Sequence, residues 1–203
     1  MRVTSEPGES PSRSFTANAR RSQIVAAAID TIAELGFPQA SFARIAQRAG
    51  LSSTRLISYH FASKDELIGE VAREVFTSVE AFMAERMRDQ HTARDMLCAY
   101  IRSNLEFTDA HRQQMKALMQ IFLNGALDFD AADDVLIVSQ AERILQHGQR
   151  TGEFRDFDTR VMGRTIQRAV EGLPFLLESD PDVDTDAYAD ELVTLFDLAT
   201  RAA

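Results

Sequence analysis

The sequence predicts an all-α protein of about nine helices. Apolar residues recur at spacings of three and four along most of the chain, which is the period of a helix with one buried face. No segment is a clear candidate for a strand, and turn-forming residues interrupt the helical rhythm at short intervals. With 203 residues, 45% of them apolar, the chain is long enough to bury a sizeable core.

The first predicted helix follows a polar arm. Residues 1–17 are rich in Ser, Pro, Gly and Arg and nearly lack apolar side chains, so we expect a flexible arm there. From Asn18 to Leu35 the apolar residues keep the helical spacing, and Gly36 followed by Pro38 ends the pattern.

Two short helices are predicted next. Ser41 can cap a helix of about two turns, which Gly50 ends with a left-handed turn. Ser52 or Ser53 can cap a third helix that runs to about Tyr59. Two short helices joined in this way form a helix-turn-helix, which places its second helix in the major groove of DNA. Alone the pattern is weak evidence, because helix pairs with a glycine turn are common in helical proteins.

Longer helices fill the rest of the chain. Ser63–Glu66 has the form of a capping box and starts a long fourth helix, whose apolar face contains Ile68, Val71, Val75, Val79 and Phe82. Five more helices are predicted, from Thr92 to about Asp109, His111 to about Leu127, Ala131 to about Thr151, Thr159 to about Leu177, and Thr185 to the end. The breaks fall at residues 89–91, 128–130, 152–154 and 179–182.

The charge is divided unevenly along the chain. Residues 1–64 contain 8 basic and 4 acidic side chains, a net charge of +4, whereas residues 65–203 contain 14 and 27, a net charge of −13. Together the two parts give the formal charge of −9. Because phosphate repels an acidic surface, this division suggests that only the basic head meets a polyanion. Chance clustering of surface charge is the alternative.

The residues disfavour several other functions. Cys98 is the single cysteine, so an internal disulfide is excluded, and no Cys/His tract has the spacing of a zinc site. The chain has no glycine-rich phosphate loop, His-Glu-x-x-His motif or nucleophile elbow, so we expect neither an enzyme nor a cofactor. The acidic run Glu178–Glu191 is more typical of a solvated turn than of a metal site. Lacking a signal peptide or a membrane-spanning run, the protein is expected in the cytoplasm, away from membranes.

Linked motifs in the first third of the chain carry a family resemblance. They are Ile24-Val-Ala-Ala-Ala28, Gly36-Phe37, Ile45-Ala46, Ala49-Gly50-Leu51-Ser52, Tyr59-His60-Phe61 and Ser63-Lys64-Asp65-Glu66-Leu67. This set resembles the TetR (tetracycline-repressor-like) family of bacterial transcriptional regulators, and it covers about fifty residues with high specificity. The remainder matches only in the number and length of its helices. The resemblance implies a repressor that a ligand releases from DNA.

Nine residues in or beside the helix-turn-helix are candidate DNA contacts. The resemblance places Ser41, Ser58, Tyr59 and Lys64 at or near phosphates, and Ser53, Thr54 and Arg55 where bases are read. Arg44 and His60 join them because their side chains suit phosphates and guanine edges.

The recognition segment departs from the commoner family pattern at two points. From Gly50 to Phe61 the chain takes eleven steps, where that pattern has ten, and Ser58 stands where a tyrosine is common. The phosphate contact can therefore pass to Tyr59. The alternative role of Tyr59 is to pack the corner between the third and fourth helices.

A stripe rich in Met and Phe in the second half of the chain has two possible roles. Core packing is the simpler role for any single residue. Soft thioethers and rings also line adaptable apolar pockets, and polar residues among them can orient a ligand. The candidate pocket residues are Tyr100, Asn104, Phe107, Met115, Met119, Phe122 and Gln140. Their character predicts an apolar or partly aromatic effector.

The last two predicted helices carry apolar stripes that suit a partner chain. The helix from Thr159 has a second apolar edge at Val161, Phe175 and Leu176, and a helix with two apolar edges needs two partners. By resemblance, both helices pair with their copies in a homodimer, through Met162, Ile166, Leu173, Leu177, Leu192, Leu195 and Phe196. A symmetric dimer would read two half-sites of a palindrome.

These observations predict three parts: a flexible arm at residues 1–17, a helix-turn-helix DNA-binding domain at 18–64, and a helical ligand-binding and dimerisation domain at 65–203. The expected partners are a double-stranded DNA operator, a small-molecule effector and a second copy of the chain. The alternative is a ligand-independent helical DNA-binding or interaction module, whose DNA binding no metabolite would alter.

Overall fold

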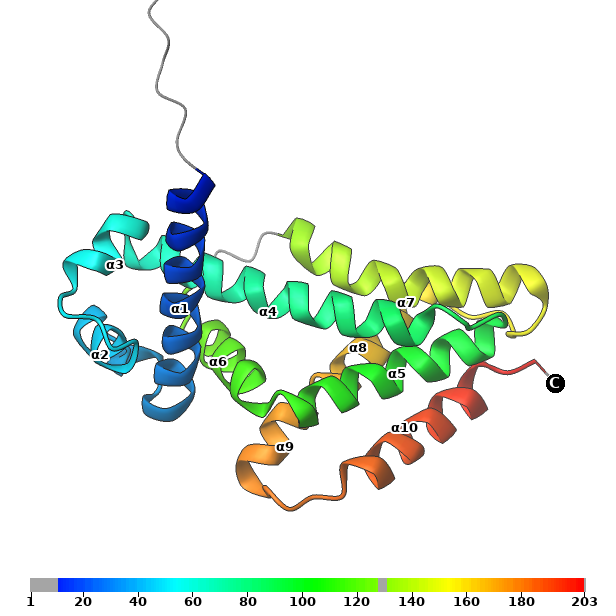
Figure 1. Cartoon of the computed structure of the whole chain (residues 1–203). Helices are drawn as coiled ribbons and strands as arrows, with labels where there is room; N and C mark the ends of the chain where they lie inside the picture. The colour runs from blue at the N-terminus through cyan, green and yellow to red at the C-terminus, as the bar shows by residue number, and fades with distance from the viewer. Residues whose placement is uncertain (1–10, 128–130, 203) are drawn as a thin grey trace, which may run out of the picture.

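The computed structural model describes residues 11–127 and 131–202, and every regular element in these ranges is a helix (Figure 1). The elements are α1 (Pro11–Leu35), a 3-10 helix (Phe37–Gln39), α2 (Phe42–Arg48), α3 (Arg55–His60), α4 (Lys64–Met87), α5 (Ala93–Ala110), α6 (Arg112–Leu123), α7 (Ala131–Thr151), α8 (Thr159–Val170), α9 (Leu173–Ser179) and α10 (Thr185–Thr200). An isolated bridge joins Phe154 to Arg201. The predicted all-α class is confirmed.

Helix α1 begins earlier than predicted. It starts at Pro11 rather than Asn18, so the second part of the predicted arm is helical. A proline suits the first turn of a helix, because its missing N–H would have no partner there. Residues 1–10 of the predicted arm lie outside the described residues, as does the predicted break at 128–130.

The helix predicted from Thr159 to about Leu177 is two helices in the structure. Helix α8 ends at Val170, and α9 begins at Leu173. Pro174 has no N–H to donate to the carbonyl of Val170 one turn earlier, and its ring would clash with that carbonyl. This break brings the α-helices in the described ranges to ten, where about nine were predicted.

One core cluster lies between α1, α2, α3, the first half of α4 and α6. Its fully buried side chains include Ile32, Ile45, Ile57, Leu67 and Ile121. Helix α6 is distant in the sequence, yet it packs on α1 (Figure 1). Residues of α6, which belongs to the acidic segment 65–203, therefore complete the first core cluster.

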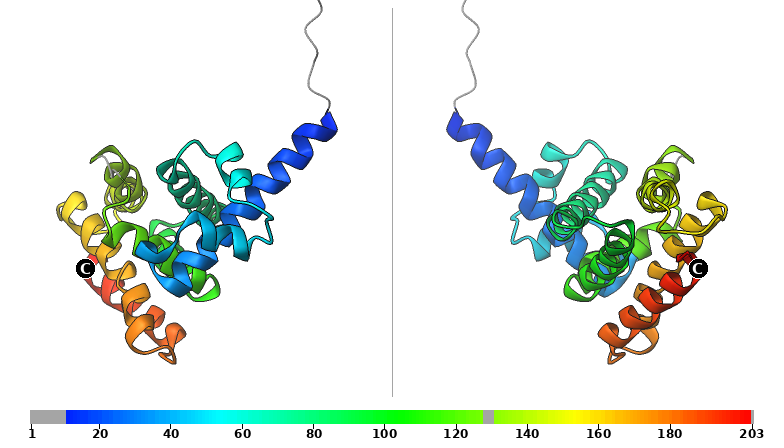
Figure 2. Two further views of the ribbon diagram at one scale, coloured as in Figure 1. Left: turned by 90° about the vertical axis from the view of Figure 1, so that its left-hand side faces the viewer. Right: turned by 90° about the vertical axis from the view of Figure 1, so that its right-hand side faces the viewer.

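A second core cluster joins the end of α4 to α5, α7, α8, α9 and α10. Helix α5 is central to it and packs against α4, α7 and α10. The buried side chains there include Tyr100, Leu145, Ile166 and Phe196. In both views of Figure 2, α8, α9 and α10 lie on the side of the molecule away from α1.

Helix α4 belongs to both clusters. Val71 and Val75 lie in the first cluster, and Met83 lies in the second. The helix is continuous over 24 residues, a rod of about 36 Å at 1.5 Å per residue. The predicted division between residues 64 and 65 thus falls at the first turn of this rod.

Candidate nucleic-acid interface

The turn between α2 and α3 has the glycine geometry that the sequence predicts. Gly50 has a φ of 64°, in the left-handed region that favours glycine. The N–H of Leu51 donates to the carbonyl oxygen of Ala46 at 2.9 Å and closes the end of α2. At the other end of α2, Oγ of Ser41 accepts a hydrogen bond from the N–H of Arg44, which confirms the predicted cap.

Helix α3 is held from one side and exposed on the others. Ile57 is the buried residue of this helix, and it packs in the first core cluster with Ile45 of α2. Phe61 follows the helix and is also buried, as a residue that packs the corner toward α4. Arg55 and Ser58 are exposed, so polar side chains of α3 face solvent.

Tyr59 is 81% exposed, so it does not pack the corner between α3 and α4. Its ring meets the ring of His60 edge to face, with the centroids 5.2 Å apart. A phenol this open to solvent is available to a phosphate, as in the first of its two predicted roles.

The remaining candidate DNA contacts lie on exposed turns or helix starts near α3. Ser53 and Thr54 are exposed just before α3, and Oγ of Ser53 accepts a hydrogen bond from the N–H of Arg55 at 3.1 Å. Arg44 is exposed and donates to Oε1 of Gln39 at 2.8 Å. Lys64 begins α4, with its Nζ 4.4 Å from the centroid of the Phe37 ring.

Charged neighbours influence two basic groups near this surface. Partial burial lowers the pKa of His60, and the nearby cations Arg21 and Arg20 lower it further. Arg48 pairs with Glu34, and this hydrogen bond raises the pKa of Arg48. Arg48 is therefore engaged by a carboxylate of α1, whereas Arg55 lies exposed at the start of α3.

The predicted pocket residues lie on three helices of the body. Tyr100, Asn104 and Phe107 are on α5, Met115, Met119 and Phe122 are on α6, and Gln140 is on α7. Phe107 and Met119 are buried but belong to neither core cluster, whereas Met115 packs against the first cluster and Phe122 is 37% exposed. The ring of Phe107 stacks on His111 at 4.2 Å and meets Phe82 edge to face at 5.4 Å.

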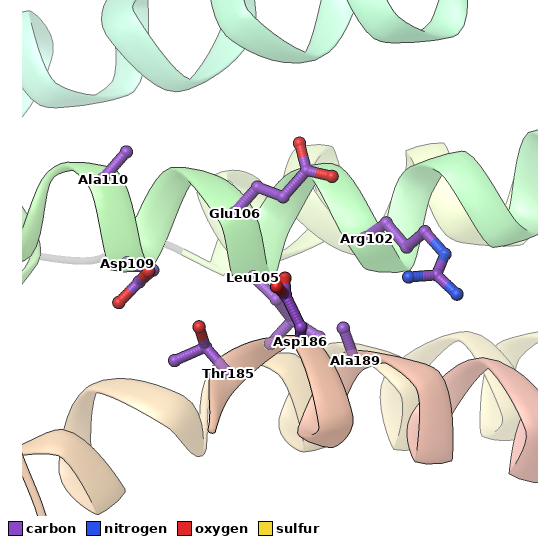
Figure 3. A pocket seen from close by; sticks show the side chains of 8 residues that line it. All are labelled: Arg102, Leu105, Glu106, Asp109, Ala110, Thr185, Asp186 and Ala189. Atoms are coloured by element: carbon purple, nitrogen blue, oxygen red, sulfur yellow. The ribbon is translucent and has the colours of Figure 1, made fainter. Parts of the chain in front are cut away.

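Two hollows of the described surface lie between α5 and α10, apart from the predicted pocket residues. One has a volume of about 120 Å³ and is lined by Arg102, Leu105, Glu106, Asp109, Ala110, Thr185, Asp186 and Ala189 (Figure 3). Three of its charged groups have partners, since Arg102 pairs with Asp190, Glu106 with Arg86 and Asp109 with Arg112. The other hollow lies toward the end of α10, around Cys98 and Asp197. No predicted pocket residue lines either hollow.

A buried polar contact on α8 is a feature that the sequence reasoning missed. The hydroxyl of Tyr100 donates to Oε1 of Gln167 at 2.6 Å, and Nε2 of Gln167 donates to Glu171 at 2.8 Å. Burial and the Glu171 carboxylate raise the pKa of Tyr100 above its ordinary value. The signal in the sequence was a glutamine between Ile166 and Val170, in the apolar stripe of the helix.

The predicted dimer residues divide into buried and exposed groups. Ile166, Leu173, Leu177 and Phe196 are at most 9% exposed, because they pack in the second core cluster of their own chain. Met162 and Leu192 are half-buried at its edge, and Leu195 is 53% exposed. Three further apolar side chains on α8, α9 and α10 are as open as Leu195, namely Val161, Phe175 and Leu198.

The described residues offer neither a metal-binding cluster nor a membrane-spanning helix. No group of three or more His, Cys, Asp or Glu side chains in the described ranges is arranged to hold a metal ion. In the same part of the chain, no helix combines the length and apolar character that crossing a bilayer demands.

The fold and the exposed face of α3 define a helix-turn-helix DNA-binding protein with a helical body. Residues 24–71 match the family model described as "Bacterial regulatory proteins, tetR family". The chain is similar to the HTH-type transcriptional regulator BetI of Cronobacter sakazakii, with 27% identity over 184 residues, 85% of this chain and 91% of that protein. These matches confirm the predicted resemblance to the TetR family of transcriptional regulators.

Solved structures support the fold over nearly the whole chain. A regulator from Saccharomonospora viridis in complex with choline has a TM-score of 0.79 at 20% identity, over 92% of this chain and 100% of that one. AibR, in complex with isovaleryl coenzyme A and operator DNA, has a TM-score of 0.74 at 18% identity, over 87% and 97%. BetI and the Saccharomonospora viridis protein are described as transcriptional regulators, and AibR was solved with operator DNA.

Proposed function

We propose that the protein is a repressor that binds a palindromic operator as a homodimer and leaves it when a small apolar or aromatic ligand binds the body. The exposed polar face of α3 carries the proposal, because Ile57 anchors the helix while Arg55 and Tyr59 face solvent. A repressor works where bacterial DNA lies, so we place the protein in the cytoplasm and assign it no catalytic step.

The DNA contacts follow from the surroundings of each side chain. Ser53, Thr54 and Arg55 stand at the exposed start of α3, the end of a recognition helix that meets base edges. Tyr59 and Lys64 follow at its other end, where they suit phosphates. Ser41, Arg44, Ser58 and His60 complete the proposed surface. Residues 18–64 thus act as the DNA-binding domain.

The exposed apolar edge of α8, α9 and α10 is the proposed dimer surface. It consists of Val161, Phe175, Leu195 and Leu198, all more than half exposed in the single chain. Met162 and Leu192 border it, whereas Ile166, Leu173, Leu177 and Phe196 support it from inside. Isologous pairing of this edge gives two α3 helices related by a two-fold axis, which suits a palindrome.

The proposed ligand site lies between α5, α6 and α7 in the part comprising residues 65–203. The solved complexes of related folds with choline and with isovaleryl coenzyme A support a body that holds small molecules. Phe107 and Met119 are buried outside both core clusters, and α6 packs on α1. A ligand near them would push on α6 and on the rod α4, and so alter the spacing of the two recognition helices.

Selection of bound sequences from a random pool of double-stranded DNA tests the operator claim. Recovery of a palindrome supports both DNA reading and two-fold symmetry, and recovery of no preferred sequence contradicts them. Compounds that raise the melting temperature are then titrated with and without the selected operator. A repressor must bind its ligand more weakly on the operator, by the factor with which the ligand weakens DNA binding. Equal affinity for every stabilising compound favours a ligand-independent module.

A further inference from the structure

Arg21 of α1 reaches the junction between α3 and α4. Its Nη1 donates to the carbonyl oxygen of His60 at 2.7 Å, and its Nη2 donates to Oε2 of Glu70 at 3.1 Å. The same Nη2 lies 3.6 Å from Oε1 of Glu66. The guanidinium carbon stands 4.2 Å from the centroid of the Phe61 ring. One planar side chain thus contacts the last residue of α3, the residue after it, and two carboxylates of α4.

The contact with His60 meets a need of the short helix. The last carbonyls of an α-helix have no partner within the helix, and α3 contains only the residues from Arg55 to His60. Arg21 satisfies the carbonyl of the final residue with a charge-assisted hydrogen bond. It therefore stabilises the end of the helix that we assign to DNA reading.

The contacts on α4 join that end to the long rod. Glu66 also accepts a hydrogen bond from the N–H of Ala62 at 2.6 Å, in the turn between α3 and α4. Glu70 also pairs with Arg73 one turn along α4. A guanidinium donates in a fixed planar fork, so its hydrogen bonds to His60 and Glu70 constrain the direction of α3 relative to α4.

We infer that Arg21 is a positioning residue, which sets the angle of α3 against α4 and so governs operator selectivity without contacting DNA. This inference rests on the proposed reading of DNA by α3. The two terminal nitrogens of Arg21 both donate hydrogen bonds within the protein, and the carboxylates of Glu66 and Glu70 compensate its charge. A phosphate would have to displace these partners.

The neighbouring Arg20 provides a matched control. It lies on the same helix, and its Nη1 donates to Oε1 of Gln23, also on α1, at 2.7 Å. Arg20→Gln therefore removes the same positive charge from the same region without breaking the contact with His60 or Glu70.

The test compares affinities for the selected operator and for random-sequence DNA over a series of salt concentrations. Arg21→Gln should weaken operator binding by about tenfold, the cost of losing a charged hydrogen bond, and random-sequence binding much less. The salt dependence should stay that of the wild type, because no phosphate contact is lost. Arg21→Lys keeps the charge but lacks the fork, so it should not restore selectivity. Arg20→Gln should leave the ratio of the two affinities unchanged.

Glu70→Gln tests the inference through the direction in which DNA binding changes. It removes a negative charge from the DNA-reading end, so electrostatics alone would strengthen binding to every DNA. A loosened Arg21 should instead lower the preference for the operator over random DNA. Melting temperatures of all variants show which of them fold. If Arg21→Gln does not fold, Arg21→Lys and Glu70→Gln still test the inference.

Three results would overturn the inference. They are a salt dependence in Arg21→Gln flattened by about one phosphate contact, full rescue by Arg21→Lys, and an Arg21→Gln variant that matches Arg20→Gln. If the wild-type protein selects no palindrome, the proposed function fails instead, and the two failures are thereby distinguished.

Discussion

Single residues decide where the DNA-reading helix begins and ends. Gly50 allows the chain to turn after α2 at a φ of 64°. The hydroxyl of Ser63 accepts from the N–H of Glu66 at 3.0 Å and starts α4. Between these two points, α3 depends on Ile57 and Phe61 for its attachment to the core. A substitution at a turn residue such as Gly50 should therefore change the free energy of unfolding even where the new side chain contacts no other residue.

Gly50→Ala should lower the free energy of unfolding by about 1 kcal/mol, because an L residue is strained at this φ. Nothing lies within 4 Å of a Cβ built at Gly50, so the loss comes from the backbone alone. Gly69→Ala is the control, since Gly69 is inside α4 and also has open space around a Cβ. There alanine should stabilise the helix. Urea unfolding measures both variants, and equal effects of one sign would contradict the explanation.

Lys64→Ala and Arg55→Ala should affect DNA binding in different ways. Loss of a phosphate contact at Lys64 should weaken binding to all sequences alike and reduce the salt slope by about 0.9 for each half-site. Loss of a base contact at Arg55 should relax the preference at one position of the half-site, by about 1–3 kcal/mol. Binding titrations against operator variants at several salt concentrations measure both effects.

The assignment of Lys64 fails if Lys64→Ala changes sequence preference and leaves the salt slope unaltered. The assignment of Arg55 to a base contact fails if Arg55→Ala weakens binding to every sequence equally. Arg88→Ala is a useful reference, because Arg88 is an exposed cation at the end of α4 that we assign to no DNA contact.

At the scale of elements, helix starts are held by side chains from distant segments as well as by local caps. Thr92 caps α5 locally, through a hydrogen bond from the N–H of Asp95 to its Oγ1. Glu153, from the loop after α7, accepts from the N–H groups of Ala93 and Arg94 at 3.1 and 3.2 Å. The loop and the start of the central helix are thus fastened together by one carboxylate.

Glu153→Gln should destabilise the protein by about 1 kcal/mol at neutral pH, the usual value of a helix cap. Burial alone would raise the pKa of Glu153, but hydrogen bonds from Ala93, Thr151 and Arg94 lower it below its ordinary value of 4.5. A carboxylate whose pKa is lower in the folded state stabilises the fold above the unfolded pKa. That stabilisation disappears as the pH falls from about 4.5 through the folded pKa.

The difference in unfolding free energy between wild type and Glu153→Gln should therefore be largest at neutral pH and shrink in acid. Urea unfolding at a series of pH values measures it. A difference that stays constant or grows below pH 4.5 would show that the ionised carboxylate is not the stabilising group.

At the scale of the whole molecule, the exposed apolar edge of α8–α10 requires a partner. Leu195→Glu should give a monomer at micromolar concentration, because a charge would be buried against apolar side chains of the other copy. The monomer should bind the operator poorly, since it reads one half-site. Sedimentation and operator titration measure both properties.

Leu123→Glu is the matched control for the dimer. Leu123 is 63% exposed at the end of α6, a helix that carries no residue of the proposed dimer edge, so the same substitution should leave the assembly intact. A wild-type chain that sediments as a monomer at micromolar concentration would refute the dimer.

Most local features were predictable from the sequence, and contacts between distant segments were not. The predicted cap of α3 by Ser52 or Ser53 is wrong, because Thr54 is its N-cap residue and makes no side-chain cap hydrogen bond. The caps at Ser41 and Ser63 and the turn at Gly50 depend on neighbouring residues, and the structure contains all three. The stripe with Ile166 indicated an interface, but an apolar stripe does not reveal whether its own chain or another covers it. Arg21 carried no signal, because its partner His60 lies 39 residues away.

The completion of the first core cluster by α6 has a consequence for protein engineering. Ala117, Leu118 and Ile121 of α6 are buried against the DNA-reading part of the chain. In a chimera that joins only residues 18–64 to the body of another regulator, these residues would pack against an α6 surface of different sequence. The transplanted head should therefore read its operator only when the matching face of α6 is transplanted with it.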